Sequence, residues 1–149
     1  MNRIMMLALL LVVPQSGAVD FGPLEPLVGH CWVGAFPDGK QTDEHCFEWV
    51  FDRKFIRDRH VVRGGAPYQG ETIYGWDTAT KRMSYWYWSS EGFILTGRVD
   101  YSAEGIAFPG DGDIKAEWTR PAAAGYRVTQ SRRVNGVWKE LWTMEMRPK

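Results

Sequence analysis

The residues with the most chemical potential in this chain are three histidines and two cysteines. His30, His45 and His60 have no recognisable metal-ligand spacing, and a metal centre needs three or four converging ligands. A two-histidine site from His30 and His45, diagonal neighbours on one hairpin face, is the alternative. A Gly-x-Ser-x-Gly nucleophile motif is also missing. We therefore expect no metal ligand and no enzyme activity.

The two cysteines flank an Asp38-Gly39 dipeptide, which is typical of a two-residue β-hairpin turn. In that hairpin the numbers of paired residues sum to 77, so Cys31 lies opposite Cys46. Cross-strand partners are about 5.5 Å apart at Cα, within the span of a disulfide. The sequence therefore predicts a Cys31–Cys46 disulfide. The alternative is two reduced, buried thiols, which a bulge at the turn would produce.

The same register sorts the hairpin into two faces. The outward face should carry Cys31, Val33, Ala35, Thr42, Glu44, Cys46 and Glu48. The inward face should carry His30, Trp32, Gly34, Phe36, Asp43, His45, Phe47, Trp49 and Phe51. Alternation in the next segment groups His60 with Ile56, Asp58 and Val62. Histidines and an aspartate among inward rings are either paired core groups or polar contacts in an apolar ligand pocket.

The elements that must position these residues are almost all strands. Segments rich in β-branched and aromatic residues alternate with Gly, Pro, Asp and Ser turns. They are residues 30–36, 42–51, 54–62, 68–76, 82–88, 93–101, 105–109, 113–120, 126–134 and 137–146. Residues 23–29 form a short helical turn. About ten short strands predict an all-β fold, an antiparallel up-and-down barrel, with a sandwich as the alternative.

The N-terminus has the pattern of a secretory signal peptide, with Arg3, an apolar run over 4–13 and cleavage after Ala18. The apolar run is about half the length of a membrane span, so we expect no stable membrane anchor. Residues 1–18 would be the signal peptide and 19–149 a single exported domain, periplasmic or secreted. The 18 basic residues balance 18 acidic ones, so no nucleic-acid partner is expected.

Two segments resemble a known family. "LVGHCW" is similar to the lipocalin Gly-x-Trp opening with one extra residue, at Gly29 and Trp32. Residues 74–92, "YGWDTATKRMSYWYWSSEG", resemble a segment of small, often exported bacterial proteins with calycin-like barrels and no assigned function. Trp86 occupies that family's tryptophan position, whereas Trp88 stands where an acidic residue is usual. The resemblance implies a barrel of about ten strands with an interior cavity, related to lipocalins and nitrobindins.

This resemblance and strand alternation together predict a pocket. Trp86 and Trp88 would face the lumen, with Tyr85 and Tyr87 on the outer wall. The predicted ligand-binding residues are Trp32, His45, Trp49, Trp86 and Trp88. The expected function is an exported protein that binds a small apolar or amphipathic molecule inside the barrel. The alternative is a solid barrel whose outer Tyr85 and Tyr87 contact a partner protein.

Haem is the cofactor that the nitrobindin resemblance would suggest. It would require a proximal histidine late in the chain, and no histidine follows His60. The last segment offers Met144 and Met146 instead, and these or His45 would make a different axial arrangement. We therefore expect no haem and no other cofactor.

Overall fold

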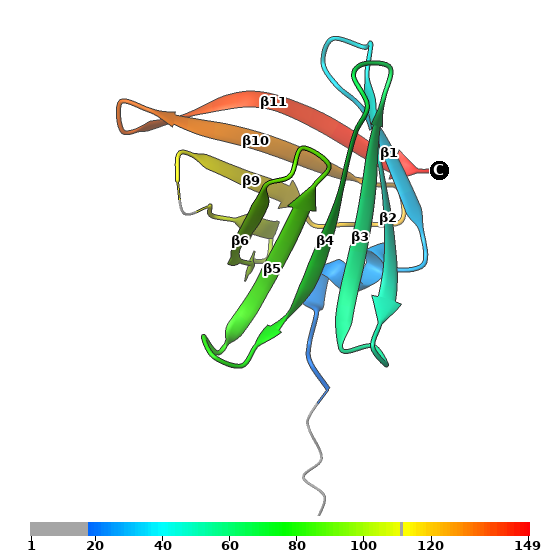
Figure 1. The fold of residues 1–149 in the computed structure, drawn as a ribbon, viewed down its shortest axis with the longest axis vertical. Helices are drawn as coiled ribbons and strands as arrows, with labels where there is room; N and C mark the ends of the chain where they lie inside the picture. The colour runs from blue at the N-terminus through cyan, green and yellow to red at the C-terminus, as the bar shows by residue number, and fades with distance from the viewer. Residues whose placement is uncertain (1–17, 111) are drawn as a thin grey trace, which may run out of the picture.

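A computed structural model describes residues 18–110 and 112–149 of the chain. The predicted signal peptide, apart from Ala18, lies outside the described residues. No helix in the described ranges is long and apolar enough to cross a bilayer. A 3₁₀ helix, η1 (Gly22–Leu27), precedes eleven strands (Figure 1). These are β1 (Cys31–Ala35), β2 (Thr42–Val50), β3 (Phe55–Arg63), β4 (Tyr68–Asp77), β5 (Arg82–Ser89), β6 (Ile94–Arg98), β7 (Asp100–Tyr101), β8 (Gly105–Phe108), β9 (Ile114–Thr119), β10 (Tyr126–Val134) and β11 (Val137–Pro148).

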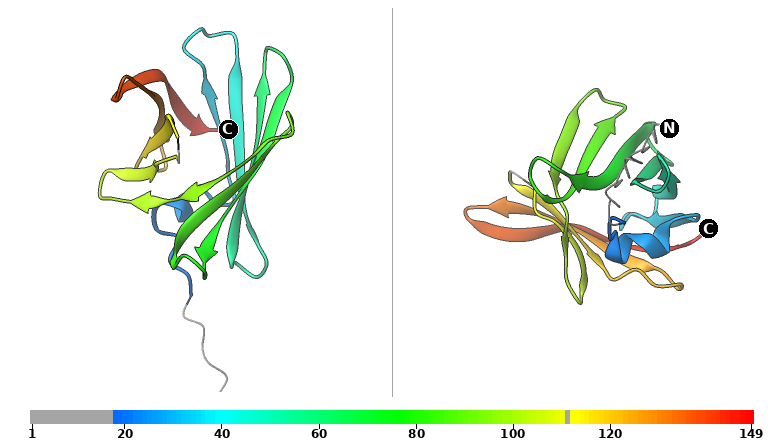
Figure 2. Two further views of the ribbon diagram at one scale, coloured as in Figure 1. Left: turned by 60° about the vertical axis from the view of Figure 1, so that its left-hand side comes forward. Right: turned by 90° about the horizontal axis from the view of Figure 1, so that it is seen from below.

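The strands form one antiparallel sheet in the order β6-β5-β4-β3-β2-β1-β11-β10-β9-β8-β7. Every neighbour is the next strand along the chain, except where β1 pairs with β11 and joins the two halves. The sheet curls round on itself, and its end strands β6 and β7 are consecutive in the chain (Figure 2). This confirms the predicted all-β, up-and-down barrel, which is nearly closed.

One predicted strand, residues 93–101, is divided into β6 and β7. At the division Val99 is buried, and its backbone N–H donates to the Met83 carbonyl at 2.9 Å. The two residues after it pair with β8 instead. The chain therefore leaves one end of the sheet at Val99 and begins the other end. Alternation within the segment could not predict a change of partner.

The first hairpin confirms the predicted register but not the predicted turn. Cys31 pairs with Cys46, and the two residues form a disulfide with Cα atoms 4.1 Å apart. The Gly39 N–H donates to the Phe36 carbonyl at 2.9 Å, and Gly39 has a φ of 67°. A type I′ turn needs positive φ at both central residues. Asp38 is not among the residues with positive φ, so the turn is wider than the predicted Asp38-Gly39 pair.

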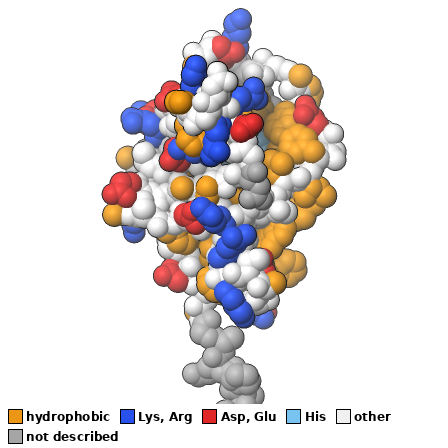
Figure 3. Space-filling view, turned by 90° about the vertical axis from the view of Figure 1, so that its left-hand side faces the viewer, with side chains coloured by type: hydrophobic (Ala, Val, Ile, Leu, Met, Phe, Trp, Pro, Cys, Tyr) orange, Lys and Arg blue, Asp and Glu red, His pale blue; other side chains and the backbone are white. Residues whose placement is uncertain are grey.

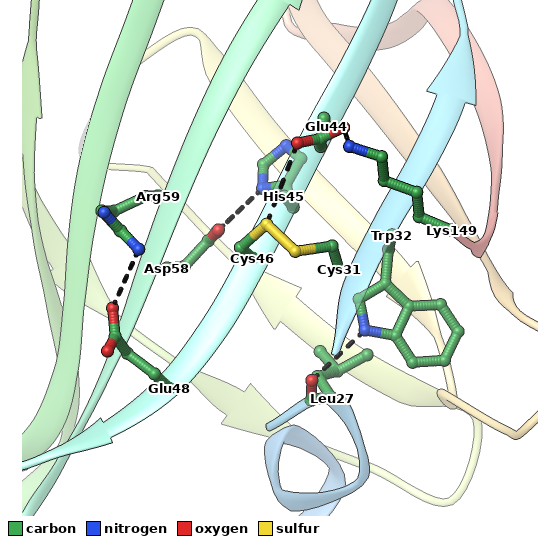
Figure 4. Close-up of a disulfide and its surroundings, with 10 residues drawn as sticks. All are labelled: Leu27, Cys31, Trp32, Glu44, His45, Cys46, Glu48, Asp58, Arg59 and Lys149. Atoms are coloured by element: carbon green, nitrogen blue, oxygen red, sulfur yellow. Dashed lines mark hydrogen bonds and ion pairs between the residues drawn. A yellow bond between two sulfur atoms is a disulfide. The ribbon is translucent and has the colours of Figure 1, made fainter. Parts of the chain in front are cut away.

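The end of the barrel nearest η1 is filled with apolar side chains, and we call this end the base. Leu24 and Leu27 of η1, and Phe21 directly before it, are no more than 1 % exposed. Trp32 donates its indole N–H to the Leu27 carbonyl at 3.3 Å (Figure 4). The other buried side chains that fill the barrel include Phe47, Ile56, Tyr74, Met83, Phe108, Trp118, Tyr126, Met144 and Met146. Burying each large apolar side chain stabilises the fold by about 1.5–3 kcal/mol.

Two residues of the predicted inward face of the first hairpin lie elsewhere. His30 is exposed, because it precedes β1 and packs edge-on against Trp32 at 6.2 Å between ring centroids. Phe51 is 72 % exposed, because the chain turns there with a φ of 50°. The predicted alternation holds only while the backbone is extended. A two-histidine site built from His30 and His45 is therefore excluded by the position of His30.

Candidate functional site

The inner face of β2, β3, β4 and β5 carries a row of polar side chains at the end of the barrel opposite η1, which we call the mouth. Its members, which we name the inner polar cluster, are Asp43, His45, Asp58, His60, Tyr68 and Tyr87. Cross-strand pairing aligns them, since His45 pairs with His60 and Asp43 is the second residue of β2. Tyr68 is the first residue of β4, directly after the β3–β4 loop.

Hydrogen bonds join the inner polar cluster into one chain. His45 Nδ1 lies 2.9 Å from Asp58 Oδ2, and its Nε2 lies 3.2 Å from Asp43 Oδ2. The other oxygen of Asp43, Oδ1, lies 3.0 Å from His60 Nδ1. His60 Nε2 is 3.0 Å from the Tyr87 hydroxyl, which is hydrogen-bonded in turn to the hydroxyl of Tyr68. Asp43 therefore bridges two imidazoles, whose rings are stacked 4.8 Å apart.

The carboxylates control the charge of this cluster. Burial alone would lower the pKa of His45, but Asp58 and Asp43 outweigh burial and raise it to about 10. Burial would raise the pKa of Asp43, but hydrogen bonds from His45 and His60 hold it well below its usual range. Burial and the Tyr68 hydroxyl raise the pKa of Tyr87 above its usual value. At neutral pH His45 is therefore cationic beside an ionised Asp43, and the Tyr87 hydroxyl is neutral.

Exposure differs along the inner face. Asp43, Asp58 and His60 are buried, and the His45 side chain is 18 % exposed. Tyr87 is half-buried and pairs across the strands with Leu95 of β6, which puts Leu95 on the same face. Leu95 is nevertheless 51 % exposed. The inner face therefore remains in contact with solvent beside β6, where the sheet ends.

A glycine makes room for the outer members of the cluster. A Cβ at Gly70 would lie 2.3 Å from the Tyr87 hydroxyl and 2.6 Å from His60 Nε2. Such distances are far below van der Waals contact, so any larger residue at this position would displace the phenol or the imidazole. Gly70 of β4 pairs with His60 of β3 and with Ser89 of β5. The absence of its side chain allows the His60–Tyr87 hydrogen bond.

The five predicted ligand-binding residues do not lie together. His45 belongs to the inner polar cluster, and Trp32 is its cross-strand partner. The indole of Trp32, however, is directed to Leu27 in the base (Figure 4). Trp49 also lies near the base, edge-on to Phe21 at 5.1 Å and beneath the guanidinium of Arg53 at 4.5 Å.

The remaining two, Trp86 and Trp88, lie on the outer face of β5, and the prediction that they face the lumen is wrong. Tyr85 and Tyr87 point inward, since they pair with the buried inner-face residues Tyr74 and Thr72. Tyr85 packs edge-on against Phe108, and the hydroxyl of Tyr87 bonds to His60. The inner face offers partners to a phenol that a wall of apolar rings would not.

The outer face of the same strands is hollowed beside Trp88. This hollow measures about 530 Å³, and Trp88, Arg59, Glu71 and Gln69 are among its lining residues. Trp88 is 43 % exposed there. Figure 3 shows hydrophobic side chains gathered along one side of the molecule, while charged groups are spread over the rest of that face. Large exposed hydrophobic residues of the β5–β6 region are Trp88, Phe93, Ile94 and Leu95.

Sequence reasoning missed the roles of Asp58, His60, Tyr68 and Tyr87. The alternation of β3 did place Asp58 and His60 on one face, but it could not bring that face against Asp43 and His45. The β2–β3 register depends on a turn in which Phe51, Asp52 and Arg53 all have positive φ. This conformation is uncommon for residues other than glycine, and no Asn-Gly or Asp-Gly dipeptide marks it.

Comparison with known proteins does not assign a family. No family model matches the chain, and no curated protein matches it with significance. The fold and the site define it instead as a nearly closed antiparallel barrel, apolar at the base, with a hydrogen-bonded His–Asp–Tyr cluster at the mouth. The disulfide on the opposite face of the β1–β2 hairpin fits an oxidising, non-cytoplasmic compartment.

Proposed function

We propose that the protein is an exported binding protein that holds a small amphipathic molecule in the mouth half of its barrel. The observation that carries the proposal is Leu95, an inner-face side chain that is 51 % exposed beside the inner polar cluster. Ligand pockets combine apolar walls with a few placed polar groups. This part of the inner face offers both within one open region.

The filled base limits where such a molecule can lie. Trp32, Phe47 and Ile56 are nearly inaccessible, so an occupant reaches only the mouth half. There its polar group would exchange hydrogen bonds with the hydroxyls of Tyr68 and Tyr87, two half-buried residues. Its apolar part would cover Leu95 and the ring of Phe93, whose centroid lies 6.0 Å from that of Tyr87. Covering exposed apolar surface favours binding by about 25 cal/mol per Å².

Export is the second part of the proposal. It is supported by the signal-peptide pattern of residues 1–18 and by the Cys31–Cys46 disulfide, which persists where thiols are oxidised. The test is the intact mass of protein secreted or released from its own host. A chain that begins at Val19 is expected, and a retained Met1 in that fraction would contradict export.

Two adjacent residues of β6 allow a matched test of the binding site. Leu95 lies on the inner face, whereas Ile94 pairs with Trp88 on the outer face and is 62 % exposed. Titration of residues 19–149 with 1-anilinonaphthalene-8-sulfonate, an amphipathic fluorescent probe, should show saturable binding. Leu95→Glu should weaken it by about tenfold or more, because a carboxylate then occupies an apolar contact. Ile94→Glu adds the same charge nearby and should leave the affinity unchanged.

The same titration distinguishes the alternatives. Absence of saturable binding to the unmodified protein would overturn the proposal and favour a solid barrel that acts through its surface. If Trp88→Ala loses binding and Leu95→Glu binds as the unmodified protein does, the probe lies in the outer hollow instead. Circular dichroism of each variant verifies that the barrel has folded.

A further inference from the structure

We propose that Asp43, His45 and His60 form a binding site for one divalent transition-metal ion of the zinc type. Each residue can supply one ligand atom, and the three atoms lie within 4.8 Å of one another. Two imidazoles and one carboxylate are a donor set that suits Zn²⁺ and its neighbours in the first transition row. This inference rests on the buried part of the cluster and is independent of any amphipathic ligand.

The spacing of the donor atoms fits tetrahedral coordination. The edges of a tetrahedral site measure about 3.3 Å when metal–nitrogen and metal–oxygen bonds are about 2.0–2.2 Å. In this barrel a single oxygen, Asp43 Oδ2, lies 3.2 Å from His45 Nε2 and 3.3 Å from His60 Nδ1. The rings of His45 and His60, stacked 4.8 Å apart, must turn toward each other for the two nitrogens and one oxygen to point at a common centre. A metal ion would then occupy the space that the protons between these groups occupy.

The second nitrogen of each imidazole already has an outer partner. His45 Nδ1 lies 2.9 Å from Asp58 Oδ2, and His60 Nε2 lies 3.0 Å from the Tyr87 hydroxyl. Metal-bound histidines almost always donate the other N–H to a carboxylate or a similar acceptor, which orients the ring. An N–H donated to Asp58 leaves the lone pair of His45 Nε2 directed at Asp43. An N–H donated to the Tyr87 oxygen has the same effect at His60 Nδ1.

The charge and rigidity of the surroundings support the same assignment. Asp43 is 8 % exposed and Asp58 is 2 % exposed, so both carboxylates beside His45 are buried, and Asp43 also contacts His60. A divalent cation between neutral imidazoles would balance both negative charges, and buried charges need such compensation. The Cys31–Cys46 disulfide is adjacent to His45 along β2 and ties that strand to β1 (Figure 4). The strand that supplies two of the three ligands is therefore held in place.

A second group of possible metal ligands on the outer face does not compete. Cys31, Glu44 and Cys46 also lie close together, but their two sulfur atoms are bonded to each other. A cysteine binds a metal ion as a thiolate, and a cysteine in a disulfide has no thiolate to offer. The exposed His30, whose ring packs against Trp32, provides a matched control for weak surface binding by a single imidazole.

The test is isothermal titration of tag-free protein, residues 19–149, with Zn²⁺ after treatment with EDTA. One ion per chain should bind with a Kd of about 1 µM or tighter. Asp58→Asn should weaken binding about 10–100-fold, as expected for loss of an outer partner. His60→Gln should weaken it further, whereas His30→Gln should have no effect. Co²⁺ in place of zinc should give the intense visible absorption of a tetrahedral site.

Three results would overturn the assignment. They are no saturable binding to the unmodified protein, an equal loss in His30→Gln and His60→Gln, and a Co²⁺ spectrum unchanged from that of the aqueous ion. Circular dichroism of each variant shows whether it has folded. Where His60→Gln does not fold, Asp43→Asn, which nearly keeps the side-chain shape, replaces it. A folded Asp43→Asn protein that retains full zinc affinity also contradicts the proposal.

Discussion

The base and the mouth of the barrel are built from the same strands but differ in chemistry. Along β2, Phe47 is packed among aromatic rings, whereas Asp43, four residues nearer the mouth, bridges two histidines. Along β3 the same change occurs between Ile56 and His60. Burial of apolar surface at the base stabilises the folded protein. The mouth instead holds charged groups, which an apolar core would exclude. Stability and binding chemistry therefore occupy separate ends of one sheet.

The largest expected effect tests the base. Trp32→Ala should lower the free energy of unfolding by about 3–5 kcal/mol, because it removes buried surface and leaves a cavity. Trp88→Ala, on the outer face and 43 % exposed, should change it far less. Urea denaturation of both variants measures the difference. Similar losses in the two would contradict the division between a packed base and an accessible outer wall.

The disulfide should have the next largest effect, because it ties together the hairpin on which both ends depend. Cys31 and Cys46 are separated by 15 residues, and closing a loop of that length stabilises by about 3 kcal/mol in the chain-entropy model. The double variant Cys31→Ser with Cys46→Ser should unfold at correspondingly lower denaturant. Peptide mapping without reductant should recover the linked pair, and free thiols in oxidised protein would refute the pairing.

The charged groups at the mouth should make the free energy of unfolding depend on pH. The folded pKa of His45 is about 10, above its usual 6.5, so its charge stabilises the fold fully below pH 6.5. That contribution is lost as the pH rises from 6.5 towards 10, because the unfolded chain releases the proton first. In metal-free protein we expect a loss on the order of 2 kcal/mol over this range, reduced by solvent at the mouth.

The control for this pH effect is His45→Gln, which cannot carry the charge. Its stability should vary less between pH 6.5 and 10 than that of the unmodified protein. Chemical denaturation at several pH values gives both curves. Parallel curves would show that the alkaline loss arises elsewhere, and the contrast between a charged mouth and an apolar base would then be weaker.

The smallest expected effect concerns the edge of the cluster. Tyr87→Phe removes the hydroxyl that joins His60 to Tyr68, and should cost about 1 kcal/mol of stability. Tyr126→Phe, which removes a buried hydroxyl that has no hydrogen-bond partner within the described ranges, is the matched variant. A larger loss in Tyr87→Phe than in Tyr126→Phe is expected in thermal unfolding, and the reverse order would contradict the assigned hydrogen-bond chain.

Local sequence determined the strands, the barrel class and the first hairpin. Alternation and turn residues are nearest-neighbour properties, so they predicted all the main strands and placed Trp32, Asp43 and His45 on one face. The Cys31–Cys46 pairing followed because an identifiable turn set the register within fifteen residues. The turn is wider than the predicted type, but it has the same midpoint, between Asp38 and Gly39. The same residues are therefore paired.

Only the tertiary structure decided the inner polar cluster. Its members come from four strands, and the β2–β3 register depends on a turn with no distinctive dipeptide, residues 51–54. Strand alternation separates two faces but does not say which one is buried, so it could not show that Tyr85 and Tyr87, rather than Trp86 and Trp88, face inward. Which face of β5 is buried depends on contacts with residues that are distant in the chain. Gly70 leaves the space, and His60 supplies the hydrogen bond that orients Tyr87.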